Sequence, residues 1–183
     1  MAEALALMLI RDIPPPLTMP EKNSEWTKNV RRKLRSPLAG GEFIELDWKC
    51  FPADPESSKG EFLVDFLWWR AREGAVLVVE SEWSPNMSEV LTDFDKLAVI
   101  KAPFKLMIYS TYPRGPSSED LKREFEDHLS NYRQHIEGET YIFIEFLPHE
   151  RAQALVWQAD ANGEIRNVVL SSLVPEQHIT RPN

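Results

Sequence analysis

The sequence predicts an α+β fold in which helices flank a central mixed β-sheet. Several apolar runs have the length of strands, the first three predicted strands follow one another directly, and amphipathic helical segments separate the later ones. The predicted order is αβββαβ followed by αβββ. Because 183 residues can form a sizeable core and no repeat or linker interrupts them, we expect one domain over residues 1–183.

The N-terminal part is expected to contain an arm, a helix and a strand. Residues 1–20 end in the Pro-rich stretch IPPPLTMP, which favours an extended arm. A helix follows, with Ser24 as its predicted N-cap and with Pro37 and Gly40-Gly41 as its stop signals. Its apolar face carries Trp26, Val30 and Leu34. Residues 42–51 alternate in polarity, which predicts the first strand.

Two predicted strands at 61–70 and 75–83 are apolar on both faces, as is typical of central strands covered on both sides. Only a short turn separates them, so we expect an antiparallel hairpin. A helix at about 88–101, ended by Pro103, and an apolar strand at 104–112 complete this part of the sheet.

The segment 113–183 is expected to add one helix and three strands. The helix covers about 117–134, and a strand follows at 140–148. The last two strands form a hairpin whose turn is Asn162-Gly163, a strong turn signal. A tail follows from residue 174.

Composition limits the classes of function. With 21 Lys and Arg against 29 Asp and Glu, the net charge is −8, which argues against a general nucleic-acid coat protein but allows a local basic strip. No apolar run approaches the roughly 20 residues needed to span a bilayer. A single cysteine, Cys50, excludes an internal disulfide, so we expect a reduced, cytoplasmic protein.

Three carboxylates are expected to meet on neighbouring strands. Asp65 lies in an apolar run, where an unpaired carboxylate costs several kcal/mol, so it needs a partner such as a metal ion. The alternatives are Arg70, Trp N–H groups or a register that opens Asp65 to water. Glu80 and Glu82 share one face of the next strand. Three such carboxylates suit Mg²⁺ or Mn²⁺, which activates water and neutralises charge on a phosphodiester. A solvated Glu-Ser-Glu at a strand end is the alternative.

The αβββαβ order, the Asp of the second strand and the acidic residue near the end of the third resemble the PD-(D/E)XK nuclease superfamily, also called restriction-endonuclease-like. The resemblance covers a nuclease-like core at about 22–112, with Val64 at the usual Pro position. It implies that Asp65 and Glu80 bind metal and act in catalysis. Glu82 stands where the superfamily usually has Lys. The implied function is Mg²⁺-dependent hydrolysis of nucleic acid, mainly DNA.

Some members of this superfamily supply the lysine from the following helix, where Lys96 and Lys101 are the candidates. Lys101 falls within the apolar stripe of that helix, whereas Lys96 lies closer to Glu80 along the axis, about 12 Å against about 20 Å from the helix start. We favour Lys96 because its long stem can curl around the helix flank. The alternatives are an exposed Lys96 that pairs with its neighbours Thr92, Asp93 or Ile100, and a helix-terminal Lys101 that complements the dipole.

The sequence also suggests how the protein could bind nucleic acid or another protein. The first helix has a basic face that carries Lys28, Arg31, Arg32 and Arg35. This face could bind a phosphate backbone, and the alternative is that it is simply exposed to solvent. The competing function is a catalytically inactive nuclease-like domain that binds nucleic acid or protein, which Glu82 and the acidic balance favour. A homodimer through the late strands and the Pro-rich arm is a third alternative.

Overall fold

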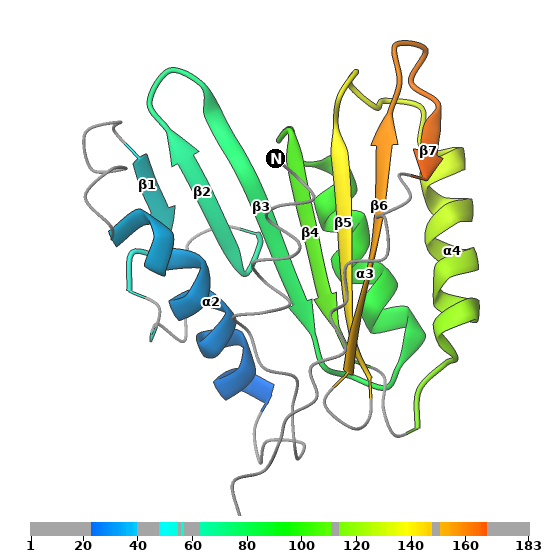
Figure 1. Ribbon diagram of the computed structural model, residues 1–183, viewed down its shortest axis with the longest axis horizontal. Coiled ribbons are helices and arrows are strands. Elements are labelled where there is room, and N and C mark those ends of the chain that lie inside the picture. The colour runs from blue at the N-terminus through cyan, green and yellow to red at the C-terminus, as the bar shows by residue number, and fades with distance from the viewer. Residues whose placement is uncertain are drawn as a thin grey trace, which may run out of the picture.

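The structure is a computed structural model that describes residues 23–39, 48–54, 56, 63–110, 114–147 and 151–167. In these residues three helices flank a seven-stranded mixed sheet (Figure 1), which confirms the predicted α+β fold and its order of elements. The predicted arm at 1–20 and the tail from 174 lie outside the described residues. Among the described helices, none is long and apolar enough to cross a membrane.

The strands lie side by side in the order of the sequence. The first three strands pair antiparallel, the middle strands β3, β4 and β5 pair parallel, and the last three pair antiparallel again. The strands are β1 (Trp48–Phe51), β2 (Phe66–Arg70), β3 (Gly74–Glu82), β4 (Phe104–Tyr109), β5 (Thr140–Leu147), β6 (Arg151–Ala159) and β7 (Ile165–Asn167). The helices are α2 (Asn23–Ala39), α3 (Met87–Val99) and α4 (Ser118–Asn131).

Two apolar cores lie on the two faces of the sheet. Helix α2 covers one face, and α3 and α4 cover the other (Figure 1). Side chains of a strand point alternately to the two faces, so Leu77 and Val79 pack with α2, whereas Val78 packs with Phe94 of α3 and Phe125 of α4. This burial on both faces explains why the central strands are continuously apolar.

Two predicted hairpins are present. The turn Ala71–Glu73 joins β2 to β3, and Gly74 adopts a φ of +89°, which favours glycine at that position. The register set at the turn shifts by one residue at a β-bulge between Trp68 and Trp69, which places Phe66 opposite Val79 and Leu67 opposite Val78. The Asn162-Gly163 turn joins β6 to β7 as expected.

Several predicted boundaries are wrong by a few residues. Strand β2 begins at Phe66, so Asp65 directly precedes the strand instead of lying inside it. Helix α3 ends at Val99 because Ile100 already has an extended backbone, so Lys101 lies beyond the helix. Helix α2 begins at Asn23, so Ser24 lies inside the helix and is not its N-cap. The helix runs past Pro37 and ends at Ala39, which agrees with the predicted stop at Gly40-Gly41. The remaining parts of the predicted strands fall outside the described residues, at 42–47, 61–62, 111–112 and 148.

Candidate functional site

Asp65 is held by two elements that flank it. Its Oδ1 accepts a hydrogen bond from Nη2 of Arg31 at 3.3 Å, and its Oδ2 accepts from the main-chain N–H and the hydroxyl of Ser81 at 3.0 and 2.6 Å. Nε of Arg31 also donates to the main-chain oxygen of Asp65 at 2.8 Å. These bonds tie the residue to α2 and β3 and leave one acceptor position of the carboxylate for a ligand.

The protein groups that the sequence suggested as partners of Asp65, Arg70 and Trp N–H groups, are therefore wrong, because Arg31 and Ser81 bind it instead. Arg70 pairs with Glu73 across the β2–β3 turn, at the far end of the hairpin from Asp65. Arg31 was expected on an exposed basic face, but it is buried because its guanidinium reaches across from α2 to Asp65. The Asp65 side chain remains 25% exposed, so it is accessible from solvent.

Glu80 lies next to Asp65 on the neighbouring strand. The antiparallel register of β2 and β3, continued by one residue beyond Phe66 and Val79, places Asp65 opposite Glu80. The Glu80 side chain is only 4% exposed, and its Oε1 has no hydrogen-bond donor. Burial raises the pKa of Glu80 to about 8, helped by the negative charges of Asp65 and Asp93 and opposed by Lys96. This carboxylate lacks the partners that a buried charge requires.

Lys96 is the cation closest to this carboxylate. Its Nζ lies 3.5 Å from Oε1 of Glu80, within ion-pair distance but outside hydrogen-bond geometry, and 2.5 Å from Oδ1 of Asp93. Burial lowers the pKa of Lys96, but the hydrogen bond to Asp93 and the charges of Glu80 and Asp93 outweigh it, so the net shift is upward. The ammonium is therefore charged and is shared unequally between two acids.

Asp93 was not singled out from the sequence, where it was only a neighbour of Lys96. It belongs to the site because α3 runs back along β3, which brings the third residue before Lys96 against the same strand end. Asp93 could have been predicted from its spacing. It lies three residues before Lys96 on the helix that follows the acidic strand end, and side chains with this spacing are neighbours on a helix. We refer to Asp65, Glu80, Glu82, Asp93 and Lys96 as the carboxylate cluster.

Glu82 has a different role from Glu80. Its Oε1 accepts hydrogen bonds from the main-chain N–H groups of Trp83 and Ser84, both at 2.7 Å, and so stabilises the turn that leads to α3. Burial and a side-chain hydrogen bond with Asp93 raise its pKa, against the opposing effect of these N–H groups. Among the described residues, no group of three or more His, Cys, Asp or Glu side chains has the spacing of a metal site.

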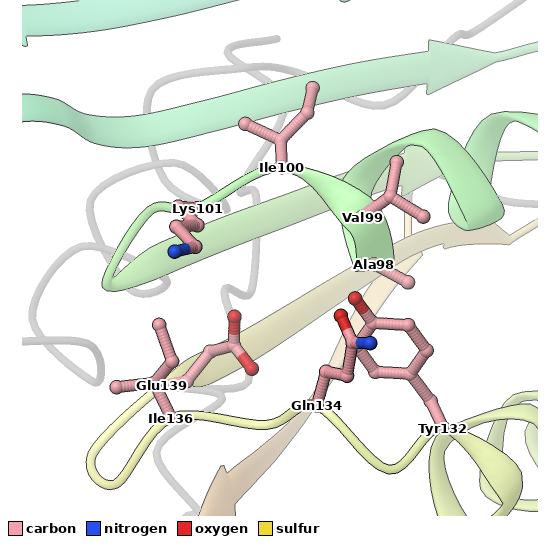
Figure 2. A pocket seen from close by; sticks show the side chains of 8 residues that line it. All are labelled: Ala98, Val99, Ile100, Lys101, Tyr132, Gln134, Ile136 and Glu139. Carbon is pink, nitrogen blue, oxygen red and sulfur yellow. The ribbon is translucent and has the colours of Figure 1, made fainter.

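Lys101 lies at the other end of α3 from this cluster. It is exposed and lines a pocket of about 230 Å³ together with Ala98, Val99, Ile100, Tyr132, Gln134, Ile136 and Glu139. Figure 2 shows Lys101 on the loop after α3, across the pocket from Glu139. Of the two candidate lysines, Lys96 is thus the one that reaches Glu80, as its axial position favoured.

The other three residues of the predicted basic face bind groups of this chain. Lys28 pairs with Glu25 at 3.0 Å, Arg32 pairs with Glu56 at 2.5 Å, and Arg35 donates to the main-chain oxygen of Ala53. They stay at or near the surface. For the dimer considered from the sequence, none of the large exposed apolar side chains of the described residues belongs to β5, β6 or β7; they are Leu63, Trp69, Val99 and Ile136.

A second buried polar group, which the sequence did not indicate, lies beside the pocket. Lys105 of the apolar strand β4 is 1% exposed; it pairs with Glu139 and donates to the main-chain oxygen of Ala98 at 2.9 Å and to the hydroxyl of Tyr141 at 3.1 Å. Glu139 also lies 3.1 Å from Nδ1 of His135. These groups satisfy one another and bind the start of β5 to the end of α3.

No family model, curated protein or solved structure matches the chain. The arrangement of Asp65, Glu80 and Lys96 therefore has to be interpreted from its own geometry. The likeness to the PD-(D/E)XK superfamily is an interpretation that rests on the order of elements and on these residues.

Proposed function

We propose that the chain is a metal-dependent nuclease of the PD-(D/E)XK kind that hydrolyses phosphodiester bonds of nucleic acid, DNA in particular, in the cytoplasm. The observation that carries this proposal is the buried Oε1 of Glu80, which has no hydrogen-bond donor and lies beside the ammonium of Lys96. An acid of β3 and an acid directly before β2, next to a lysine, are the groups that this chemistry needs.

Mg²⁺ or Mn²⁺ fits the donors at this corner. Asp65 has a free acceptor position and Glu80 has an orphaned buried oxygen, and hard carboxylate oxygens are the ligands these ions prefer. When bound, the ion would activate a water molecule and neutralise charge that develops on the phosphate. Arg31 and Ser81 hold Asp65 in place, so the protein keeps this oxygen donor oriented before a ligand arrives.

Lys96 supplies the positive charge of the protein itself. Its side chain is 38% exposed and mobile enough to turn from the acids towards a phosphate that approaches from solvent. The surface cations of α2, which are Lys28, Arg32 and Arg35, lie on the helix that carries Arg31 and could hold the flanking backbone. Each must first exchange its present partner for a phosphate.

The test is cleavage of supercoiled plasmid and of labelled single-stranded DNA in the presence of Mg²⁺. We expect the wild type to cut, and Asp65→Asn or Glu80→Gln to lower the rate by about a hundredfold or more. Matched controls are the exposed Asp95→Asn and Glu164→Gln, which should cut like wild type. Equal rates for Glu80→Gln and Glu164→Gln would overturn the proposal, as would the absence of cleavage by the wild type.

The second candidate is a nuclease-like module that binds nucleic acid without cutting it. The three hydrogen bonds that Asp65 already accepts from Arg31 and Ser81 favour it, together with Glu82 at the usual lysine position. Fluorescence anisotropy of labelled DNA separates the two functions. Binding that survives Glu80→Gln and chelation of divalent ions, with no cleavage by the wild type, would support the module.

A further inference from the structure

The charges of the carboxylate cluster are not evenly balanced. Asp65 is neutralised by Arg31, and Oε1 of Glu82 is occupied by two main-chain N–H groups. In the described residues, Glu80 and Asp93 are left with one cation between them, the ammonium of Lys96. One ammonium thus faces both acids, and the second acid has to be neutralised by a proton or by another cation.

The ammonium satisfies these two acids unequally. It lies 2.5 Å from Asp93, whereas Oε1 of Glu80 stays at 3.5 Å and has no hydrogen bond. An ammonium is a single positive charge that donates N–H bonds in fixed directions, whereas a divalent ion accepts oxygen ligands on several sides. A divalent ion in this place could bind both carboxylates. Such an ion would therefore compete with the Lys96 ammonium for the same position.

From this geometry we propose that Glu80 and Asp93 form the cation-binding site of the cluster, that Lys96 fills it in the metal-free protein, and that a divalent ion binds by displacing Lys96. This inference rests on the proposed function for the presence of a metal, but it adds Asp93 as a ligand and makes Lys96 a competitor. The displaced ammonium turns to solvent, where a phosphate would meet it.

The affinity for Mn²⁺ tests the proposal without any measurement of activity. Electron paramagnetic resonance of free Mn²⁺ gives the dissociation constant for the full-length chain. Lys96→Met should bind Mn²⁺ at least about tenfold more tightly than wild type, because the competing charge is gone. Asp93→Asn should bind about tenfold more weakly or worse. The matched controls Lys101→Met and Asp95→Asn, both exposed, should bind like wild type.

Displacement is tested separately by the reactivity of the amine. Acetylation of Lys96 by an activated ester, followed by mass spectrometry of its peptide, should become several-fold faster when Mn²⁺ saturates the wild type. Lys101 of the same molecules provides the reference rate. Unchanged or slower acetylation of Lys96 in the presence of bound Mn²⁺ would contradict its displacement.

The outcomes separate this inference from the proposed function. If wild type and Lys96→Met bind Mn²⁺ equally and Asp65→Asn abolishes binding, the competition is wrong while the metal-dependent nuclease survives. If Lys96→Met binds but wild type does not, the competition is supported and Mg²⁺-dependent cleavage by the wild type is ruled out. If neither chain binds Mn²⁺, both proposals are wrong.

Discussion

Arg31 of α2 and Asp65, at the start of β2, bind each other through both side-chain and main-chain atoms. The guanidinium donates from Nη2 to the carboxylate at 3.3 Å and from Nε to the main-chain oxygen at 2.8 Å. This pair connects the helix on one face of the sheet to the strand end that carries the candidate site. The position of Asp65 therefore depends on how α2 packs, and the packing of α2 depends in turn on Asp65.

Arg31→Gln should destabilise the fold and disturb the site. It removes the cation that neutralises a partly buried carboxylate, which typically costs about 1–3 kcal/mol of the free energy of unfolding. Urea denaturation measures this loss. The matched variant is Arg32→Gln on the same helix, whose exposed pair with Glu56 should leave the denaturation midpoint unchanged. Equal midpoints for the two variants would show that the Arg31–Asp65 pair does not stabilise α2 on the sheet.

Stability should fall as pH rises in the absence of divalent ions. The pKa of Glu80 is raised from 4.5 to about 8 in the folded chain, so the folded state holds a proton that the unfolded state has lost between these values. The free energy of unfolding contributed by this group is complete below pH 4.5 and decreases by up to roughly 1.4 kcal/mol per pH unit until about pH 8.

The measurement compares wild type with Glu80→Gln by urea denaturation between the two pKa values. Because the amide does not titrate, the variant should gain stability relative to wild type as pH rises, while all other groups cancel in the difference. Glu164→Gln, which alters an exposed acid on the β6–β7 turn, should show a flat difference. A flat difference for Glu80→Gln as well would mean that Glu80 titrates in the folded chain at its ordinary pKa.

Lys105→Met should be among the most damaging substitutions outside the carboxylate cluster. It leaves Glu139 buried without its cation, and breaking a buried ion pair in this way typically costs about 3–5 kcal/mol. The double variant Lys105→Met/Glu139→Gln should recover about half of this loss because the orphaned charge is gone. Thermal denaturation checks both, with the exposed Lys101→Met as a neutral control. A double variant no more stable than Lys105→Met alone would contradict the pairing.

The central strands could be predicted from the sequence because burial on both faces of the sheet makes them continuously apolar. Continuous apolar runs at 75–83 and 140–148 predict β3 and β5 to within a residue at each end, and the Asn162-Gly163 turn predicts the last hairpin. The predicted boundaries differ from the observed ones where tertiary contacts of a polar residue set the limit of a helix or strand. Asp65 is one case, since its bonds to Ser81 and Arg31 come from residues far away in the chain.

The candidate site is predictable only in part for the same reason. The short turn between β2 and β3 predicts that these two strands pair. A β-bulge between Trp68 and Trp69 then shifts the register by one residue, and only this shift, which the spacing does not predict, brings Asp65 opposite Glu80. Lys96 and Asp93 depend on the direction in which α3 returns along β3, and Arg31 depends on the docking of α2. Lys105 gave no signal, because a single lysine in an apolar strand has the same pattern whether it is paired inside or exposed at an edge.

Crystals of the full-length chain grown with Mn²⁺ give the most direct test of the divalent-ion site. Anomalous scattering locates the ion without reference to activity or to any assumed mechanism. We expect a peak in contact with a carboxylate oxygen of Glu80, with Asp65 or Asp93 also bound to the ion and the Lys96 ammonium moved away from both acids. A map without a peak at saturating Mn²⁺, in which Lys96 still lies between Glu80 and Asp93, would contradict the proposed metal-dependent function.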